Sequence, residues 1–265
     1  MPVIKGLGWT FDTVASTYEK FRPGYVDALY NQIFDYLPID AQSAVVEIGS
    51  GAGQATAPVL QTGCKLTAVE CGERFSALLK EKIKDYPRFS VVTGKFEDTD
   101  FAEKSVDLVF SASAFHWIPE EIGYQKVFSM LKSGGVFARF ANHPYRDKGN
   151  PELSRKIDEL YGKYYDTFHN RKQQPLKEYD EQQAKDRALI AGKYGFTDLQ
   201  YGLFYRTRVF TAKEYVALLG TYSDHIAIEK SIRDAFFAEI EDAINQHGGT
   251  FTVYDTMDLQ LARKP

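Results

Sequence analysis

The sequence contains only two cysteines, Cys64 and Cys71, among its 265 residues. They lie seven positions apart, and neither has a histidine or a further cysteine at the spacing of a zinc site. We therefore expect neither a disulfide framework nor a metal ion, and we assign no metal ligands. Such sparing use of cysteine is typical of a reducing compartment, so the sequence predicts a cytoplasmic protein.

Long apolar runs and basic runs are also missing. No stretch approaches the roughly 18 consecutive apolar residues of a membrane-spanning helix, and the first residues lack the apolar segment of a signal peptide. Lysine and arginine number 32 against 36 aspartates and glutamates, which gives a net charge of -4 at pH 7. Without an excess of positive charge to neutralise phosphates, we expect no nucleic-acid partner, and we expect no membrane partner either.

The sequence does contain enough apolar material for a large core, since 44% of its residues are hydrophobic. Its first half alternates apolar runs with amphipathic helical patterns. We expect strands over 44–48, 65–70, 89–93, 106–110 and 136–141, and helices over 24–37, up to about 61, over 73–84 and from Pro119 onward. This alternation predicts an α/β fold with a doubly wound, mostly parallel sheet.

The second half changes character after residue 143. Residues 144–195 are charged and rich in tyrosine, with a weak helical periodicity that predicts a helical insertion over the carboxyl edge of the sheet. Two further strands, over 199–210 and 250–262, bring the sheet to seven and are expected to pair antiparallel at one end of it, with helices over 211–219 and about 224–246. The predicted core is therefore 1–143 and 196–265, with an N-terminal cap within 1–37. The insertion 144–195 is predicted to cover the substrate.

A glycine-rich turn follows the first strand, in the stretch Val45–Gln54. A strand that runs into glycines lets backbone N–H groups approach a ligand closely. Gln54 occupies the position of the third glycine of a dinucleotide fingerprint, and the Gly-Lys-Ser/Thr of a phosphate-binding loop is absent. Glu47 lies two residues before Gly49, and a carboxylate there would repel a pyrophosphate but accept a ligand that carries a sulfonium and an ammonium.

Glu70 ends the second strand and is the second informative acid. A carboxylate accepts two hydrogen bonds, so it can hold both hydroxyls of a ribose. An acid at this position is shared with NAD enzymes, so Glu70 indicates a ribose and no more.

Five segments together resemble class I S-adenosylmethionine-dependent methyltransferases. They are Val46–Gly53, Val69-Glu70, Val92–Asp98, Phe110–Trp117 and Leu131–Phe137, which follow one another in the family's order over about residues 40–140. Phe11-Asp12 through Tyr18, Arg22 and Tyr25 is similar to the cap of the small-molecule branch, which includes trans-aconitate methyltransferase-like proteins. One position departs from the family, because Lys95 stands where an acid often accepts from the adenine amino group and a lysine cannot accept.

The resemblance implies a Rossmann-like fold, S-adenosyl-L-methionine as methyl donor and S-adenosyl-L-homocysteine as product. It implies donor contacts from Tyr18, Arg22, Glu47, Gly49, Ser50, Gly51, Gly53, Glu70, Cys71, Phe96, Glu97 and Ser111. Of these, Phe96 would pack on the adenine or read it through its backbone N–H. The guanidinium of Arg22 would anchor a carboxylate of either the donor or the acceptor.

Methyl transfer is an in-line displacement on an activated donor, so positioning and water exclusion can supply much of the acceleration. A base is needed only when the nucleophile arrives protonated, and His116, directly after the fourth strand, is the candidate for that role. Predicted acceptor contacts are Tyr25, His116, Trp117, His143 and Tyr145. The expected acceptor is a small molecule, a carboxylate being one candidate, and the expected state is a monomer or homodimer.

Two other functions stay open from the sequence. An NAD(P)-dependent oxidoreductase would require a third glycine at position 54 and a Ser/Tyr/Lys-type set of catalytic residues for hydride transfer. Neither is visible in the sequence. A methyltransferase-like binding protein would keep the cofactor fold without turnover. Nucleic-acid methylation is a weaker rival because the chain is acidic.

Overall fold

The protein is described here by a computed structural model that covers residues 15–171 and 176–265. The segment Phe11-Asp12 of the predicted cap lies outside the described residues. Among the described residues, no helix is both long enough and apolar enough to cross a bilayer.

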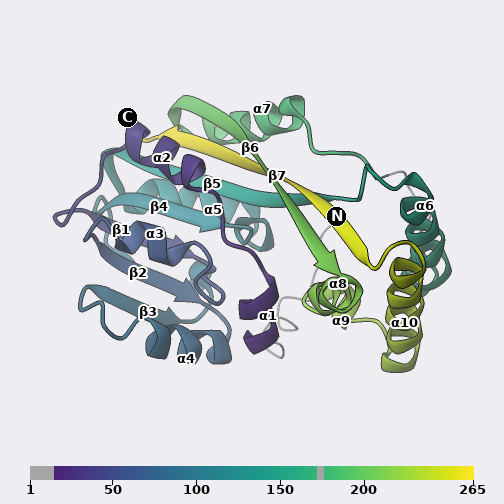
Figure 1. The fold of residues 1–265 in the computed structure, drawn as a ribbon. Coiled ribbons are helices and arrows are strands. Elements are labelled where there is room, and N and C mark those ends of the chain that lie inside the picture. The colour runs from purple at the N-terminus through teal and green to yellow at the C-terminus, as the bar shows by residue number, and fades with distance from the viewer. Residues whose placement is uncertain (1–14, 172–175) are drawn as a thin grey trace.

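A seven-stranded sheet of order β3-β2-β1-β4-β5-β7-β6 forms the centre of the described chain (Figure 1). Its parallel strands are β1 (Ala44–Ile48), β2 (Lys65–Glu70), β3 (Phe89–Thr93), β4 (Val106–Ala112) and β5 (Leu131–Tyr145). Strand β7 (Thr250–Arg263) pairs antiparallel with both β5 and β6 (Thr197–Thr211). The predicted α/β fold, the seven strands and the antiparallel pair at one end of the sheet are confirmed.

Helices cover both faces of this sheet, because both faces are apolar. On one face α2 (Asp27–Tyr36), α3 (Thr56–Leu60) and α4 (Glu73–Lys82) bury Leu29, Val59 and Leu79 against the strands. On the other face α5 (Glu120–Met130) buries Val127 and Met130. Burial of each such side chain stabilises the fold by about 1.5–3 kcal/mol, so these two layers stabilise the sheet on both faces.

A group of helices lies beyond the carboxyl ends of the strands (Figure 1). It consists of α6 (Pro151–Leu160), the π-helical turn Tyr161–Asp166, α8 (Ala212–Leu219), α9 (Ser223–Ile226) and α10 (Lys230–Gln246). These elements share a core of their own with the start of β7. Helix α1 (Ala15–Phe21) packs against both α4 and α8, so it bridges the sheet and this group.

The segment predicted as one insertion contributes to two places. Helix α6 packs against α10, whereas α7 (Glu181–Leu189) packs on β6 and β7 and is followed by the short helix Ile190–Tyr194. Asn150 caps α6 by accepting from the N–H of Leu153, and Asp180 forms a capping box with Gln183.

Three elements differ from the sequence prediction in a way that has a visible cause or changes the element. The helix expected to reach residue 61 from the glycine turn spans only Thr56–Leu60, because Gly49, Gly51 and Gly53 all have positive φ and delay the helix. The helix expected over 224–246 is two helices, with a break after Ile226. Strand β5 begins five residues earlier than expected, and its pairing with β4 shifts register between Leu131 and Val136, where Gly134-Gly135 lie.

Candidate functional site

The glycine loop after β1 is built so closely that only glycine fits at its first position. Gly49 has φ +69°, and a Cβ added there would lie 2.3 Å from the Cβ of Ala114. Gly51 has φ +54° but leaves open space, since a Cβ there would meet nothing closer than 3.6 Å. The backbone of the loop therefore packs against the segment after β4 at Gly49 and faces free space at Gly51.

The carboxylate of Glu70 holds this loop in place. Its Oε2 accepts from the N–H of Gly51 at 2.8 Å, and its Oε1 accepts from the N–H of Gly72 at 2.8 Å. The thiol of Cys71 is a weak donor 3.7 Å from Oε1, and the residue is exposed. The tips of β1 and β2 are thus joined by one carboxylate, at the position where the sequence predicted a ribose contact.

Glu47 does not fulfil the electrostatic role assigned to it from the sequence. Its side chain is completely buried, accepts from Thr56 Oγ1 at 2.7 Å, and does not line the pocket described below. Burial raises the pKa of Glu47 to about 8, so the carboxyl is mostly protonated at neutral pH. The argument that a carboxylate at this position repels a pyrophosphate is therefore wrong in physical terms.

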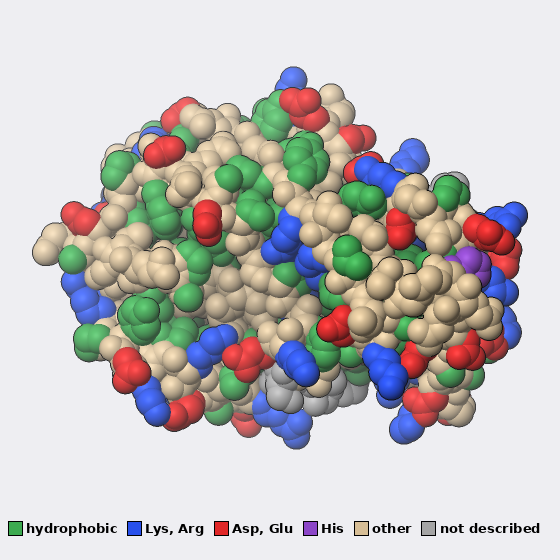
Figure 2. Space-filling view, in the orientation of Figure 1, with side chains coloured by type: hydrophobic (Ala, Val, Ile, Leu, Met, Phe, Trp, Pro, Cys, Tyr) green, Lys and Arg blue, Asp and Glu red, His purple; other side chains and the backbone are tan. Residues whose placement is uncertain are grey.

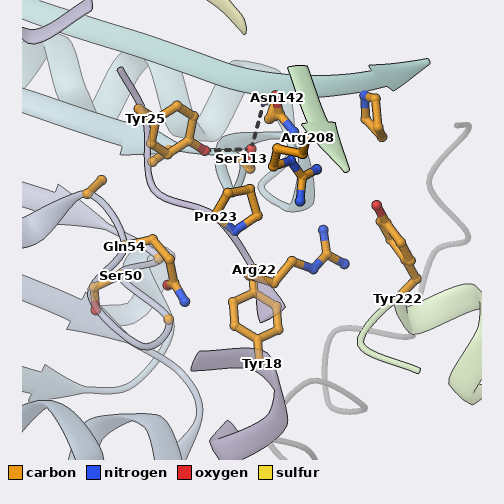
Figure 3. A pocket seen from close by; sticks show the side chains of 15 residues that line it. Tyr18, Arg22, Pro23, Tyr25, Ser50, Gln54, Ser113, Asn142, Arg208 and Tyr222 are labelled. Atoms are coloured by element: carbon orange, nitrogen blue, oxygen red, sulfur yellow. Dashed lines mark hydrogen bonds between the residues drawn. The ribbon is translucent and has the colours of Figure 1, made fainter. Parts of the chain in front are cut away.

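A pocket extends from the glycine loop toward the helical group (Figure 3). It holds about 620 Å³ of empty space, part of which is open to solvent. Its lining consists of Tyr18, Arg22, Pro23, Tyr25, Gly49, Ser50, Gly51, Gln54, Ala55, Ala112, Ser113, Asn142, Pro144, Arg208 and Tyr222. In Figure 3 Ser50 and Gln54 lie at one end, and Arg208 and Tyr222 lie at the other.

Arg22 connects the N-terminal cap to the helical group. Its Nε donates to Thr221 Oγ1 at 2.9 Å, and its Nη2 donates to the Thr221 carbonyl at 3.1 Å. The guanidinium also lies 3.9 Å from the ring centre of Tyr222 and 5.1 Å from that of Tyr18. Arg22 therefore links the cap to the helical group across the pocket. None of the contacts among the described residues pairs its guanidinium with a carboxylate.

Tyr25 and Ser113 meet in the middle of the pocket wall. Their hydroxyl oxygens are 2.8 Å apart, and Ser113 Oγ also accepts from the N–H of Asn142 at 3.3 Å. Ser113 has φ +54°, which is uncommon for a residue with a Cβ, and its N–H is held by the carbonyl of Phe140 at 2.8 Å. The strained turn after β4 thus directs the Ser113 hydroxyl toward the cap.

Two arginines from β6 share one buried carboxylate of β7. Arg208 binds Asp255 with Nε at 2.5 Å and Nη2 at 2.9 Å, and Arg206 binds it with Nε at 3.2 Å and Nη2 at 3.0 Å. Asn142 Nδ2 donates to the same carboxylate at 2.9 Å, and Asp255 is only 1% exposed. In Figure 2 basic side chains lie where β6 crosses from the sheet to the helical group.

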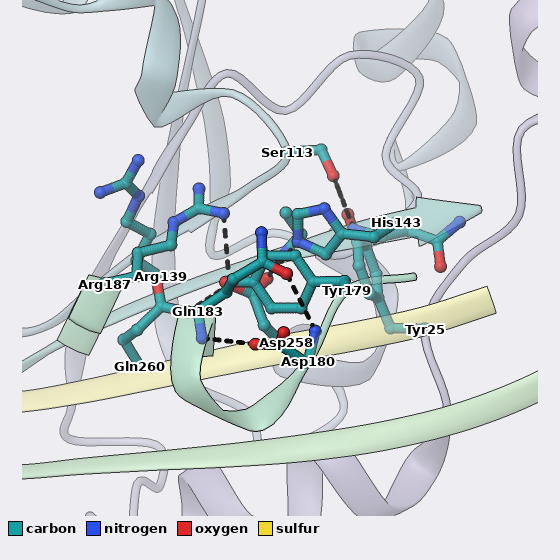
Figure 4. A network of polar contacts seen from close by, with 12 residues as sticks. Tyr25, Ser113, Arg139, His143, Tyr179, Asp180, Gln183, Arg187, Asp258 and Gln260 are labelled. Carbon is teal, nitrogen blue, oxygen red and sulfur yellow. Dashed lines mark hydrogen bonds and ion pairs between the residues drawn. The ribbon is translucent and has the colours of Figure 1, made fainter. Parts of the chain in front are cut away.

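A second polar network lies beside this pocket, beneath α7 (Figure 4). The fully buried Asp258 accepts from His143 Nε2 at 3.0 Å, from the Tyr179 hydroxyl at 2.9 Å and from Arg187 Nη1 at 3.2 Å. The rings of His143 and Tyr179 stack with centres 3.7 Å apart. Because an ionised carboxylate only accepts, His143 donates to Asp258 from Nε2.

The remaining predicted acceptor contacts lie outside the lining of the pocket. His116 and Trp117 follow β4 with their ring centres 5.2 Å apart, and Tyr145 ends β5. Desolvation by the surrounding chain lowers the pKa of His116, and the charges of Arg187 and Arg139 add to the effect, although the residue is exposed at its outer side. His116 is therefore neutral at pH 7 but a weak base.

Four residues that were predicted to contact the methyl donor interact with other residues of the chain. Ser111 is fully buried and donates its hydroxyl to the Ile48 carbonyl at 2.9 Å. Phe96 is only 3% exposed and packs in the core, and Lys126 Nζ donates to the Glu97 carbonyl at 2.8 Å. A Cβ on Gly53 would lie 2.8 Å from Leu79 Cδ2, so this glycine serves the packing of the loop.

The structure brings some of the predicted residues together and adds others. Tyr18, Arg22, Tyr25, Gly49, Ser50 and Gly51 line one pocket, as the sequence analysis grouped them around a donor and acceptor. Sequence reasoning missed Ser113, Asn142, Arg208 and Tyr222 as lining residues. The only signal for Arg208 is its two-residue spacing from Arg206, which places both on one face of a strand. Among the described residues, no group of three or more His, Cys, Asp or Glu side chains could hold a metal ion.

Comparisons with known proteins agree with this geometry. Residues 46–138 match a family described as a methyltransferase domain. An uncharacterized methyltransferase of Schizosaccharomyces pombe is 26% identical over 242 residues, which cover 90% of this chain and 88% of the relative.

Solved structures show the same fold. A type II methyltransferase structure from Anaeromyxobacter dehalogenans superposes with a TM-score of 0.65 at 22% identity, over 92% of this chain and 98% of that chain. Phosphoethanolamine N-methyltransferase 2 of Haemonchus contortus, in complex with phosphomonomethylethanolamine and S-adenosylhomocysteine, gives 0.57 at 15% identity, over 100% and 61% of the respective chains.

Proposed function

We propose that this chain, a class I S-adenosylmethionine-dependent methyltransferase, transfers the methyl group of its donor to a small organic molecule. The observation that carries the proposal is the single pocket wall shared by the glycine loop and the cap, in which Gly49–Gly51 face Tyr18, Arg22 and Tyr25. A donor on the loop and an acceptor under the cap would meet in that space.

The residues at the loop fit S-adenosylmethionine. Ser50 Oγ is buried without a hydrogen-bond partner among the described residues, so a ligand group can bind it. Gly51 has room for a ligand beside it, and the carboxylate of Glu70, which accepts from the N–H of Gly51, stands at the tip of β2 where the family resemblance implies a ribose contact. We assign the donor's carboxylate to Arg22, whose Nη1 has no acceptor in the described contacts.

The donor supplies a methyl group already activated by its sulfonium. The chain's task is alignment and exclusion of water, and good alignment contributes roughly 7–11 kcal/mol of barrier reduction. Arg22 closes the cap through Thr221 and Tyr222, and Tyr25 with Ser113 forms a wall that can orient an acceptor by hydrogen bonds. For an acceptor that arrives protonated, we propose that His116 takes the proton and that Trp117, His143 and Tyr145 contact the acceptor, although none of these four residues lines the pocket described above.

Two further observations support a small acceptor, a carboxylate included. The pocket extends from the glycine loop toward the helical group, and Arg208 and Tyr222 line the end away from Ser50. The Haemonchus contortus enzyme of similar fold was solved with a small phosphorylated amine, phosphomonomethylethanolamine. We also propose that the cap and the segment 144–195 select the acceptor, and that the protein works in the reducing cytosol, since the sequence contains only two cysteines.

Transfer of a labelled methyl group tests the function. The purified chain is incubated with methyl-tritiated S-adenosylmethionine and a small-molecule extract from which proteins and nucleic acids have been removed. We expect label in an organic small molecule, and we expect Glu70→Ala to abolish most of it. Label that enters only added RNA or protein, or donor binding with no transfer to any fraction, would contradict the proposal.

A further inference from the structure

The pocket carries an unbalanced charge. Among the described residues that line it, the only ionised side chains are Arg22 and Arg208, and both are cations. Asp255, which is buried behind the wall, neutralises one positive charge, but it serves Arg206 as well as Arg208. The donor adds to the excess, since its sulfonium and ammonium outnumber its one carboxylate.

Arg208 is held in one orientation, and one nitrogen of its guanidinium has no hydrogen-bond acceptor among the described contacts. Its Nε and Nη2 are both committed to Asp255, and its side chain is 14% exposed. The described contacts give its Nη1 no acceptor. A guanidinium whose orientation is already fixed loses little freedom when it binds an anion, which favours tight and specific binding.

The two arginines lie at different ends of the space. Arg22 follows Tyr18, whose ring borders the space beside Gly51 in the glycine loop. Arg208 comes from β6 and shares Asp255 with Asn142 of β5, at the end of the pocket away from Ser50 (Figure 3). The hydroxyl of Tyr222 points toward this same end in Figure 3, and burial raises the pKa of Tyr222, so the hydroxyl keeps its proton for donation.

From this arrangement we infer that Arg208 and Tyr222 form an oxyanion subsite that binds a carboxylate or phosphate group of the methyl acceptor. The inference rests on the proposed function, because it assigns the acceptor's anionic group to one end of a pocket whose other end holds the donor. It assigns Arg208 a role in acceptor specificity and leaves donor binding to the glycine loop, Glu70 and Arg22.

Arg206 provides a matched control for Arg208. It lies two positions earlier on the same strand and binds the same carboxylate, and its Nη1 donates to the Gly24 carbonyl of the cap at 3.0 Å, but it does not line the pocket. Arg206→Gln and Arg208→Gln therefore remove the same charge from the same buried ion pair. Only the second removes a group that faces the pocket.

The test uses the full chain saturated with S-adenosylhomocysteine in a chloride buffer. Calorimetry measures the binding of inorganic phosphate and of glutarate, with glutaramide as the neutral counterpart of glutarate. We expect at least one of the two anions to bind, glutaramide not to bind, and Arg208→Gln to weaken anion binding by roughly 10- to 150-fold, as expected for charged hydrogen bonds. Arg206→Gln should change it by less than about threefold, because a charge outside the pocket is largely compensated by Asp255.

The titrations with phosphate and with glutarate distinguish which kind of acceptor carries the oxyanion. Binding of phosphate alone assigns a phosphorylated acceptor, whereas binding of glutarate assigns a carboxylic acid. Equal anion affinity in Arg208→Gln and the unchanged chain, or binding of neither anion up to tens of millimolar, would overturn the subsite. If Arg208→Gln does not fold, Arg208→Lys replaces it in the test. This variant keeps a positive charge beside Asp255 but lacks Nη1, and it must also lose most of the affinity for the anion.

Failure of the subsite is distinguishable from failure of the proposed function. S-adenosylhomocysteine should bind the unchanged chain, Arg206→Gln and Arg208→Gln with affinities that agree within about twofold, because Arg208 lies outside the donor's contacts. Retained donor binding without anion binding would overturn only the oxyanion subsite. Absence of donor binding in all three chains would overturn the proposed function.

Discussion

The hydroxyl oxygen of Tyr25 lies 2.8 Å from Oγ of Ser113, a residue 88 positions further along the chain. This contact joins the N-terminal cap to the turn after β4, at the level of the glycine loop. Tyr25 also packs edge-on against Phe140 of β5, with ring centres 4.7 Å apart. The pocket wall is thus set by a long-range contact between polar groups on an apolar support.

The strained backbone of Ser113 predicts an unusual order of stability. Ser113→Ala keeps a Cβ at φ +54° and loses the hydroxyl, whereas Ser113→Gly loses the hydroxyl and relieves the strain. Relief of the left-handed strain exceeds the extra backbone entropy of glycine in the unfolded chain by roughly 0.5–1 kcal/mol. Urea denaturation should therefore rank Ser113→Gly above Ser113→Ala. Equal midpoints, or the reverse order, would show that Ser113 is not strained.

Gly49 and Gly51 should respond differently to alanine. A methyl group on Gly49 meets the Cβ of Ala114, which cannot move without its backbone, and we expect a loss of about 3 kcal/mol. A methyl group on Gly51 has space, so stability should fall by about 1 kcal/mol from its φ alone. That methyl group enters the donor's space, so affinity for S-adenosylhomocysteine should fall much more than stability. Thermal denaturation and calorimetry measure the two effects, and full donor affinity in Gly51→Ala would contradict the site.

Glu47 makes stability depend on pH in a defined direction. Burial raises its pKa to about 8, against about 4.5 in the unfolded chain, so between these values the folded state holds a proton that the unfolded chain releases. The contribution of Glu47 therefore falls as pH rises, by about 1.4 kcal/mol per pH unit. Glu47→Gln should gain about 2.5 kcal/mol relative to the unchanged chain between pH 5.5 and pH 7.5 in urea denaturation.

The control for this comparison is Glu73→Gln, since Glu73 is exposed in the first turn of α4. Its stability difference from the unchanged chain should stay constant over the same pH range. A constant difference for Glu47→Gln as well would mean that Glu47 is ionised in the folded state.

His116 should titrate below the ordinary range of a histidine. Desolvation is the main cause, and Arg187 and Arg139 oppose its protonation. A nuclear magnetic resonance titration of the ring proton should show a midpoint below pH 6.5, and Arg187→Gln should raise it. Arg155→Gln, on the exposed side of α6, is the control that should leave it unchanged. A midpoint at or above 6.5 in the unchanged chain would contradict the environment described for His116.

Much of the fold was predictable because local patterns encode it. The strands at 44–48, 65–70 and 89–93 are short runs rich in apolar and β-branched residues, and their observed limits agree with the prediction. The glycine turn and Glu70 were predictable as one site because the carboxyl ends of neighbouring parallel strands meet at one edge.

The remaining features depend on register and on partners distant in sequence. The pairing of Arg206 with Asp255 across β6 and β7 cannot be read from either strand alone, so Arg208 was not a candidate. The charge of Glu47 depends on its burial beside Thr56, which sequence spacing does not report. The helical group formed by α6, α8 and α10 required knowledge of which apolar faces meet, since each helix alone indicates only that it is amphipathic.

The most direct test is a pair of calorimetric titrations, one with S-adenosylhomocysteine and one with NAD. We predict that S-adenosylhomocysteine binds once per chain, that Glu70→Ala weakens this binding by about 1.5–3 kcal/mol, and that NAD produces no binding heat. Binding of NAD in place of S-adenosylhomocysteine would contradict the account, because the glycine loop and Glu70 would then serve a dinucleotide.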